Sequence, residues 1–471
     1  MQRSKRVLIG VAAAGLTLAA ACGGSDSNSG ANGGGGATES IRGQTITVLV
    51  PYAMPKSLLD KFTAETGVKV NYVRTGWDAT HNKLLVANQA QSYIADVAEF
   101  DWSFTGQFAG AQWVEPLDGL VSASTLNDLK STDAAFISGG KTYAACYSND
   151  FRVSMYNTKM FAKAGITEFP QTFDELGQAV TKLKASGVQY PLSIPMAATE
   201  GGVTPWYLLT LAMGGQLFDD QLAPTFSDPS SAGYQALQWE ADAVKNGWVS
   251  PGAVSLNDDV AFDKFTAGEA AIVLATGPGN MATANDKSES NIAGDAALGL
   301  VPGVDGPGAS FGLPEGLSIP VTAKHKAAAA AFIEWWERPE NAIAIYKTQG
   351  SLPCGASTIK QLADSGELQG GDVLNAELPH VSPLFSAGAP IWYSQFSSDA
   401  QGLLNAAVKG QMSVPDALGQ LASKAESHNQ EGCVSAAAAR AATGPPARPR
   451  SWGGSWSPPP WWPWRRSSSI R

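Results

Sequence analysis

Aromatic residues stand beside short polar residues at several places in this 471-residue chain. A sugar presents C–H faces and a rim of hydroxyl groups, so a site for it needs aromatic rings for stacking and carboxylates or amides for hydrogen bonds. The pairs of this kind are Asp101-Trp102, Asn149-Asp150 followed by Phe151, Trp206-Tyr207 and Trp392-Tyr393. Packing in a hydrophobic core is the alternative for any one pair. Their recurrence near predicted strand ends favours a binding site for a polyhydroxylated ligand.

Sequence patterns for catalysis are weaker. Residues 308–312, Gly-Ala-Ser-Phe-Gly, fit the nucleophile elbow G-x-S-x-G, which works only when strand, turn and helix lift the serine hydroxyl out of a sheet. Pro314 and Gly316 follow at once and disfavour such a helix, so a Gly-rich loop is the better interpretation. The acidic pairs Asp219-Asp220 and Asp258-Asp259 are expected to be solvated loop charges rather than a glycosidase pair. We therefore predict no catalytic residue and no enzyme.

Motifs for metals and cofactors are missing from the sequence. The four histidines are scattered, and neither H-E-x-x-H nor C-x-x-C occurs. The run Gly277-Pro278-Gly279 lacks the spacing of a dinucleotide fingerprint. We therefore predict neither a metal site nor a cofactor.

The charge of the chain is distributed unevenly. The formal net charge is −10, yet residues 1–21 hold three basic residues and residues 433–471 hold six arginines, with no acidic residue in either segment. The body between them is therefore more acidic than the chain as a whole. Because phosphate binding needs clustered Lys and Arg, this argues against nucleic acid as a partner.

The first residues have the pattern of a secretory signal. A basic start precedes an apolar run from Val7 to Ala21, which is too short to span a bilayer. With Cys22 at the first mature position, residues 1–21 resemble a bacterial lipoprotein signal peptide, although Ala19 stands where that family more often has Leu. We expect Cys22 to carry a lipid anchor on the outer face of the cell membrane, followed by a flexible linker over residues 22–43. An ordinary secretory signal is the alternative.

The other end of the chain changes composition abruptly. Residues 433–471 consist mainly of Ala, Arg, Pro, Gly, Ser and Trp without a helical or strand period, which predicts a disordered tail. The change resembles out-of-frame translation of GC-rich DNA. Contact with a membrane interface, which Trp and Arg favour, is the alternative.

Between these ends, predicted strands alternate with predicted helices. Gln44–Val50 has the alternation of a strand, Ser57–Thr66 has helical spacing, and Val68–Tyr72 alternates again. A helix beginning near Asp78 and a strand over Ala95–Phe100 continue the order. This succession predicts a parallel sheet covered by helices. Similar units recur through the body, with helices predicted over residues 173–185 and 207–213. The body is too long for one compact domain, so two α/β lobes are expected.

Short motifs in a fixed order carry a resemblance to a known family. They are Ile46 to Val50, Ala95-Asp96-Val97, Trp113 to Leu117, Gly140 to Tyr143, Met155-Tyr156-Asn157, Pro170 to Leu176, Phe265 to Ala271 and Gly350 to Pro353. Together they are similar to the extracellular solute-binding proteins of ABC importers, in the carbohydrate-binding family of the maltose-binding-protein type. The resemblance covers roughly Thr45 to Ser427. It departs at Gly279, where the family often has a stacking Trp, and at Cys146, where it usually has Pro.

The resemblance implies a two-lobed, periplasmic-binding-protein-like α/β fold with a hinge of crossing segments. The first lobe would contain residues 44–147 plus about 300–352, and the second residues 148–299 plus about 353–430. The expected ligand-binding residues are Asp101, Trp102 and Glu315 from the first lobe, with Asn149, Asp150, Trp206 and Trp392 from the second.

The expected partners are a carbohydrate, the ABC permease in the membrane and the lipid anchor, and the protein is expected to be a monomer. Two alternatives remain open. One is the same fold binding a non-sugar solute such as a polyamine, which an acidic cleft with few exposed aromatics would favour. The other is a secreted hydrolase.

Two cysteines lie within the body. In an oxidising compartment Cys146 and Cys354 are natural disulfide partners, and the resemblance places both near the lobe junction. Two separate buried thiols are the alternative. The sequence leaves open whether the two residues meet.

Overall fold

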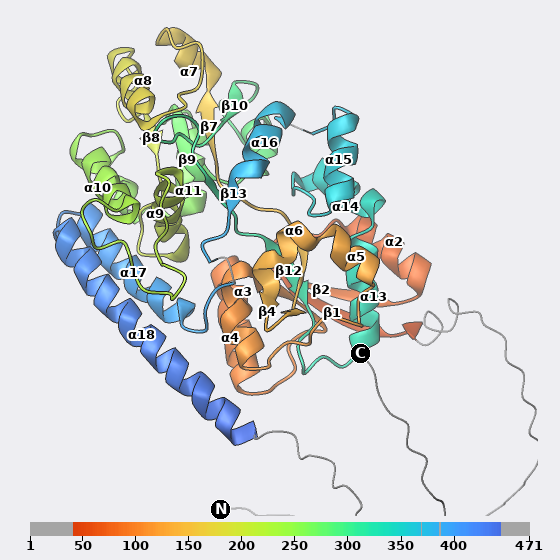
Figure 1. The fold of residues 1–471 in the computed structure, drawn as a ribbon. Helices are drawn as coiled ribbons and strands as arrows, with labels where there is room; N and C mark the ends of the chain where they lie inside the picture. Colours follow the sequence, from red (N-terminus) through yellow and green to blue (C-terminus); the bar gives the residue numbers. More distant parts are fainter. Residues whose placement is uncertain (1–40, 369, 386–387, 444–471) are drawn as a thin grey trace, which may run out of the picture.

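A computed structural model describes residues 41–368, 370–385 and 388–443. Helices and strands alternate in two lobes, which confirms the α/β class and the two-lobed architecture (Figure 1). The signal peptide, Cys22, most of the predicted linker and residues 444–471 lie outside the described residues.

The first lobe is built on a five-stranded sheet in the order β2-β1-β3-β12-β6. Its strands are β1 Thr45–Val50, β2 Lys69–Arg74, β3 Val97–Asp101, β6 Ala145–Ser148 and β12 Glu315–Ser318. β1 pairs in parallel with β2 and β3, whereas β12 runs antiparallel to β3 and β6. The alternation read from the sequence places Ile46 and Val48 wholly in the core.

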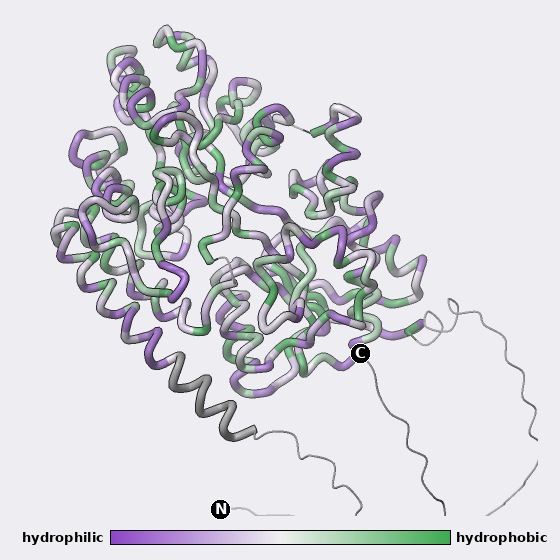
Figure 2. Tube along the Cα trace, in the orientation of Figure 1, coloured by the Kyte–Doolittle hydropathy of each residue, from purple (hydrophilic) through white to green (hydrophobic). Residues whose placement is uncertain are grey.

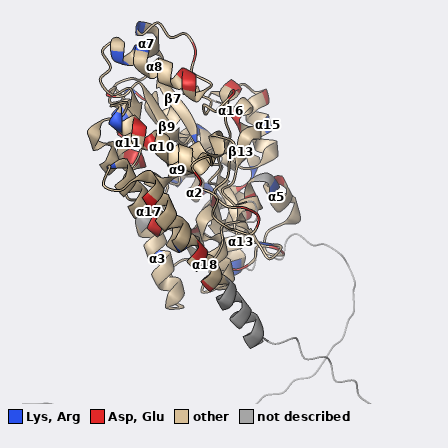
Figure 3. Ribbon diagram, turned by 60° about the vertical axis from the view of Figure 1, so that its left-hand side comes forward, with Lys and Arg blue, Asp and Glu red and all other residues tan. Residues whose placement is uncertain are grey.

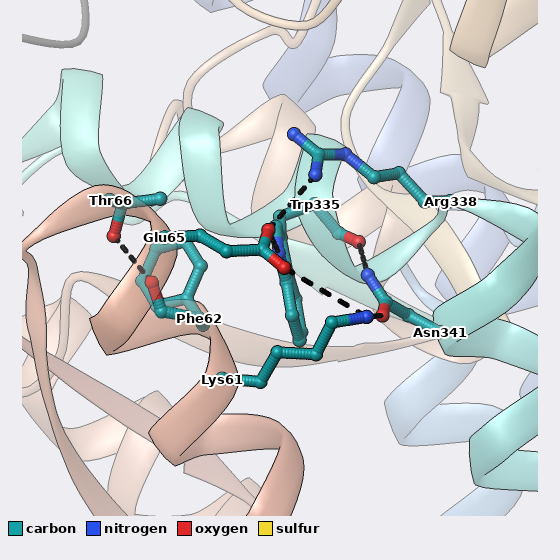
Figure 4. Close-up of polar contacts among 7 residues, drawn as sticks. All are labelled: Lys61, Phe62, Glu65, Thr66, Trp335, Arg338 and Asn341. Atoms are coloured by element: carbon teal, nitrogen blue, oxygen red, sulfur yellow. Dashed lines mark hydrogen bonds and ion pairs between the residues drawn. The ribbon is translucent and has the colours of Figure 1, made fainter.

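Helices cover this sheet, among them α2 Lys56–Thr66, α3 Trp77–Gln89 and α13 Lys326–Trp336. Phe62 of α2 meets the rings of Phe332 and Trp335 edge-on, with centroids 5.1 and 5.4 Å apart. Figure 4 shows the polar contacts beside them: the Trp335 indole donates to Glu65 Oε2 at 2.6 Å, and Lys61 Nζ donates to Asn341 Oδ1 at 2.9 Å. These contacts fix α2 against the helix pair that follows β12.

The second lobe contains a four-stranded sheet in the order β10-β7-β9-β8. Its strands are β7 Val153–Asn157, β8 Leu192–Ser193, β9 Ile272–Thr276 and β10 Ala296–Gly299. The helices around it include α7 Thr158–Lys163, α8 Phe173–Ala185, α9 Glu200–Ala212, α10 Ala232–Lys245 and α11 Asp258–Thr266. Helix α8 begins with a capping box, in which Thr172 accepts from the Glu175 N–H and the Glu175 carboxylate accepts from the Thr172 N–H.

Shorter elements and the C-terminal helices complete the fold. They are α4 Thr105–Gly110, α5 Ala123–Asp128, α6 Lys130–Asp133, α12 Asn280–Ala284, α14 Pro339–Gln349, α15 Ala356–Asp364, α16 Gly371–Glu377, α17 Tyr393–Val408, α18 Val414–Thr443, and the strands β4 Ile137–Ser138, β5 Lys141–Thr142, β11 Ser310–Phe311 and β13 Val381–Ser382. Helix α18 continues past Gly432 to Thr443, so the predicted start of the tail at Cys433 falls inside this helix. The run of alanines after Ser435 has high helix propensity, which accounts for the continuation.

Apolar and charged residues separate as the two cores require. Figure 2 shows apolar segments along the central strands of both lobes, and Figure 3 shows the Lys, Arg, Asp and Glu positions of the ribbon mainly on the outer helices. No helix in the described ranges is both long and apolar enough to cross a membrane.

Three crossing segments join the lobes, and backbone hydrogen bonds tie them together. Arg152 N donates to Phe311 O at 2.9 Å, and Leu313 N donates to Asp150 O at 3.0 Å. The third segment joins through the bond from Asn149 N to Leu352 O, which is 2.9 Å long. Gly303 still bonds to the loop before α8, which belongs to the second lobe. The chain therefore returns to the first sheet only at Glu315, where β12 begins.

A disulfide joins Cys146 of β6 to Cys354, which follows the third crossing segment. Their Cα atoms lie 5.8 Å apart, and both residues are buried. The sequence left open whether these two cysteines meet, and the structure shows that they form a disulfide bond. It links strand β6 of the first sheet directly to the segment that leads into α15.

Candidate functional site

The register of the first sheet brings three carboxyl side chains to one face. Asp101, the last residue of β3, pairs with Glu315, the first residue of β12, and Glu99 lies two residues before Asp101 on the same face. The carboxyl ends of β1 and β3 meet at this edge, which is where open α/β sheets bind ligands. Asp101 and Glu315 are separated by 214 positions in the sequence, yet they are cross-strand neighbours in the sheet.

These carboxyl groups are buried and interact strongly. Burial raises the pKa of Glu99 to about 7, although hydrogen bonds from Glu315 and Tyr147 lower it. Burial, and then the Glu99 charge, raise the pKa of Glu315 well above its usual range. Both carboxyl groups are therefore harder to ionise than an exposed glutamate. Burial, and next the Glu315 charge, raise the pKa of Asp101 as well, while Asp101 Oδ1 accepts from Ser103 N at 2.8 Å.

Tyr52 follows the carboxyl end of β1 and reaches the same carboxyl groups. Its hydroxyl donates to Glu315 Oε1 at 2.7 Å. Burial of the hydroxyl and the charges of Glu315 and Asp150 raise the pKa of Tyr52 well above its usual range. The residue as a whole is nevertheless 43% exposed. Because its hydroxyl is bound to a buried carboxyl group, the exposed area lies on the rest of the residue.

The second lobe contributes an ion pair at the first crossing segment. Arg152 NH1 lies 2.9 Å from Asp150 Oδ2, and the two side chains are 13% and 23% exposed. Burial raises the pKa of Asp150, and the Arg152 guanidinium opposes that rise. Gly277, directly after β9, borders the pair so closely that a Cβ there would lie 2.6 Å from Asp150 Oδ1. A side chain at Gly277 would therefore displace the Asp150 carboxylate.

A cavity of about 250 Å³ opens beside this ion pair. Arg152, Asp258, Thr276 and Asn280 line it, and Asn280 Nδ2 donates to Thr276 Oγ1 at 2.8 Å. Ala275, also in the lining, has a φ of 60°, a left-handed conformation that is uncommon outside glycine. The lining contains both hydrogen-bond donors and acceptors, which is what a ligand with several hydroxyl groups requires.

Glu200 at the start of α9 connects this region to the C-terminal helices. Its carboxylate accepts short hydrogen bonds from the hydroxyls of Tyr393 and Ser397 in α17, and its charge raises the pKa of Asp101. The Glu200 carboxylate therefore extends the acidic region of the first lobe into the second.

Four of the seven predicted ligand-binding residues lie in or beside this region. Asp101 and Glu315 are cross-strand neighbours, and the Asp150 charge acts on Glu315. Asn149 precedes Asp150, but it is 92% buried and its backbone belongs to the hinge. The sequence indicated these residues through their positions at strand ends.

Trp102 is placed at the same edge, but its ring is covered. It is 7% exposed, meets Phe311 edge-on at 5.3 Å and lies 4.9 Å from Tyr393. Contacts with Phe311 and Tyr393 therefore connect the first lobe to β11 and α17.

Trp206 and Trp392 lie in the core. Trp206 is wholly buried in α9, its indole donates to Gly233 O at 2.7 Å, and its ring meets Phe226 edge-on. Trp392 is 4% exposed and packs against Phe218. Neither ring has an exposed face on which a ligand could stack. Both residues pack in the core and lie outside the candidate ligand site.

Two residues of the region were missed by sequence reasoning. Tyr52 follows Pro51, which ends the first strand, and Arg152 stands between apolar residues at the start of β7. A search for single aromatic or charged residues directly after a strand would have found Tyr52. No comparable signal marks Arg152.

The nucleophile-elbow pattern is not built as one. Ser310 lies in the short strand β11, is wholly buried, and donates a short hydrogen bond to Arg152 O. In the part of the chain that the structure describes, no group of His, Cys, Asp and Glu residues is arranged to hold a metal ion.

Comparison with known proteins identifies the family. Residues 47–343 match the model of the bacterial extracellular solute-binding proteins, and the chain belongs to that family. Its fold and family are those of binding proteins.

Two curated relatives are similar over part of their length. The diacetylchitobiose binding protein DasA of Streptomyces coelicolor is 28% identical over 243 residues, covering 49% of this chain and 54% of the relative. A mannitol-binding protein of Pseudomonas aeruginosa is 29% identical over 262 residues, covering 52% of this chain and 58% of the relative. The chain thus spans somewhat more than half the length of these relatives.

Solved structures share the fold over nearly their whole length. Maltose-bound MalE3 of T. maritima superposes with a TM-score of 0.72 at 20% identity, covering 81% of this chain and 99% of that one. The GacH receptor of Streptomyces glaucescens gives 0.73 at 19% identity, covering 82% and 98%. These likenesses confirm the periplasmic-binding-protein-like fold.

Proposed function

We propose that this protein is the substrate receptor of an ABC importer, which captures a sugar or polyol between its lobes and delivers it to a membrane permease. The observation that carries the proposal is the meeting of polar groups from both lobes at the hinge. Glu315 and Tyr52 come from the first lobe, and Asp150 and Arg152 from the crossing segment of the second. Carboxylates accept hydrogen bonds from hydroxyl groups, and the guanidinium donates to their oxygen atoms.

The names of the relatives support this ligand class. The two curated relatives are named for diacetylchitobiose and mannitol, and one structural neighbour contains maltose. The proposed site comprises Asp101, Asp150 and Glu315, with Tyr52, Arg152 and Asn280 added and Asn149 as a backbone element of the hinge.

The mechanism follows from the hinge. A ligand that contacts both lobes favours the arrangement in which the lobes lie closest, and it can shift the equilibrium only by its differential affinity for that arrangement. The first lobe would comprise residues 44–147 and the return from β12 through α14, and the second lobe the remainder through α18. The closed receptor would then dock on the permease as a monomer, anchored through Cys22 to the outer face of the membrane.

A thermal-shift and calorimetric titration with maltose, diacetylchitobiose and mannitol tests the proposal. A ligand that binds only the folded state raises the melting temperature by mass action. The expected result is saturable binding of at least one of these compounds, lost in Arg152→Met and retained in Arg338→Met, whose guanidinium lies far from the site. Failure of a broad panel of sugars and polyols to bind would refute the proposal.

A second ligand class is favoured by one observation, the excess of carboxyl groups. Glu99, Asp101, Asp150, Glu200 and Glu315 act on one another, and Arg152 is the cation paired among them. A polyamine would neutralise that charge. Its binding would weaken steeply with ionic strength, whereas binding of a neutral sugar would not. Titration of spermidine beside the sugars at low and high salt separates the two classes.

A further inference from the structure

Tyr52 is the most exposed aromatic residue in the part of the chain that the structure describes, at 43%. The tryptophans expected to stack on a ligand are covered, with exposures of 7% for Trp102, 0% for Trp206 and 4% for Trp392. An exposed tyrosine ring at the carboxyl edge of the first sheet is therefore available to a ligand without any rearrangement of the core.

The ring is held from both ends. At the tip, its hydroxyl donates to Glu315 Oε1 at 2.7 Å. At the base, the Tyr72 hydroxyl donates to Tyr52 O at 2.5 Å and accepts from Met54 N at 3.2 Å, which fixes the turn after β1. A ring immobilised in this way loses little conformational entropy when a ligand arrives.

The neighbours of the ring supply the hydrogen-bond acceptors that the hydroxyl groups of a sugar require. The Tyr52 hydroxyl bonds to Glu315 of the first lobe, and the charge of Asp150, at the first crossing segment, also acts on it. A pyranose laid on the ring would bring its C–H face to the aromatic surface and its hydroxyl rim to these carboxyl groups.

We propose that Tyr52 is the stacking platform of the ligand site, with Glu315 and Tyr72 as its positioning residues, and that it selects cyclic sugars over acyclic polyols. The inference rests on the proposed function and names the ligand class of the same site. An acyclic polyol such as mannitol has no ring face to lay on the phenol, so it gains less from Tyr52 than a pyranose does.

The test compares three variants with the full-length protein. Tyr52→Ala removes the ring, and Tyr52→Phe keeps the ring without its anchor. Tyr190→Ala is the control, because Tyr190 is a partly exposed tyrosine of the second lobe whose hydroxyl accepts a hydrogen bond from Gln189 Nε2. Dissociation constants are measured by calorimetry for maltose, diacetylchitobiose and mannitol, and melting temperatures check that each variant is folded.

The expected result is a loss of about five- to tenfold in affinity for a cyclic sugar in Tyr52→Ala, from the typical energy of an aromatic contact. Tyr52→Phe should keep most of that affinity, mannitol should lose less than the sugar, and Tyr190→Ala should match the wild type. Equal losses for cyclic and acyclic ligands, an unchanged affinity in Tyr52→Ala, or wild-type binding of mannitol alone would overturn the inference while the proposed function stands. Binding of none of these compounds would overturn both.

Discussion

Glu240 should make the folded protein less stable as the pH rises. This glutamate lies on α10, is 2% exposed, and its Oε1 has no hydrogen-bond partner. Burial raises its pKa from 4.5 to about 8. The folded state therefore keeps a proton that the unfolded state releases above its ordinary pKa. The contribution of this group to the free energy of unfolding is complete below about pH 4.5, decreases as the pH rises, and is lost once the pH passes about 8.

The size of the effect follows from the shift. One pKa unit corresponds to about 1.4 kcal/mol, so the full shift would amount to at most about 5 kcal/mol. Water entry and local relaxation reduce the cost of a buried charge, so a loss of about 2–3 kcal/mol between pH 5 and pH 8.5 is the working expectation. Glu240→Gln keeps the size of the side chain and cannot ionise, and it should remove most of this loss.

Urea unfolding at pH 5, 7 and 8.5 measures the effect in the wild type, in Glu240→Gln and in the exposed control Glu168→Gln. The difference in unfolding free energy between Glu240→Gln and the wild type should grow with pH, while the control follows the wild type. Parallel pH profiles for Glu240→Gln and the wild type would refute the reasoning.

Three further changes test other features of the molecule. Replacing Cys146 and Cys354 by Ala should lower stability by about 5 kcal/mol in the chain-entropy model, since the bond closes a loop of 208 residues; equal unfolding midpoints under reducing and oxidising conditions would contradict this. Gly277→Ala should push Asp150 away from Arg152 and weaken ligand binding by ~1.5 kcal/mol or more, measured by calorimetry, with a melting temperature close to that of the wild type. Cys22→Ser should release the protein into the medium of a host that processes lipoproteins, and a mutant still bound to membranes would argue against the anchor.

Much of the fold could be predicted because local signals and tertiary packing agree. The predicted helix Ser57–Thr66 is α2 apart from its first residue, and Gly67 ends it with a φ of 74°. The predicted helix over residues 173–185 is α8, which the capping box starts. Strand β1 likewise follows its alternating sequence.

Helix α9 shows where local signals fail. The sequence predicts a helix only from Tyr207, since Gly201, Gly202 and Pro205 disfavour an earlier start. In the structure the helix begins at Glu200. Gly202 lies so close to Ala197 O that no side chain would fit there, and burial of the whole segment compensates for its low helix propensity. The same burial places Trp206 in the core, although the sequence predicted it to be a ligand-binding residue.

The candidate site was predictable only in part for a similar reason. Strand ends could be read locally, which brought Asp101 and Asp150 into the predicted site. The pairing of Asp101 with Glu315 depends on the order of strands in a sheet that a second lobe interrupts, and no spacing in the sequence expresses it. The exposure of Tyr52 depends equally on what the rest of the chain leaves uncovered.

The raised pKa values of Glu99 and Glu315 have a consequence for how ligand binding would respond to the surroundings. Hydroxyl groups that donate to these carboxyl groups favour the ionised form, so a ligand bound in this way would release protons into the medium. Its affinity would then increase with pH over the range in which the two coupled groups titrate. The heat of binding would also change with the ionisation enthalpy of the buffer. Ligand capture would thus be coupled to the acidity of the medium, with no change in the amount of protein.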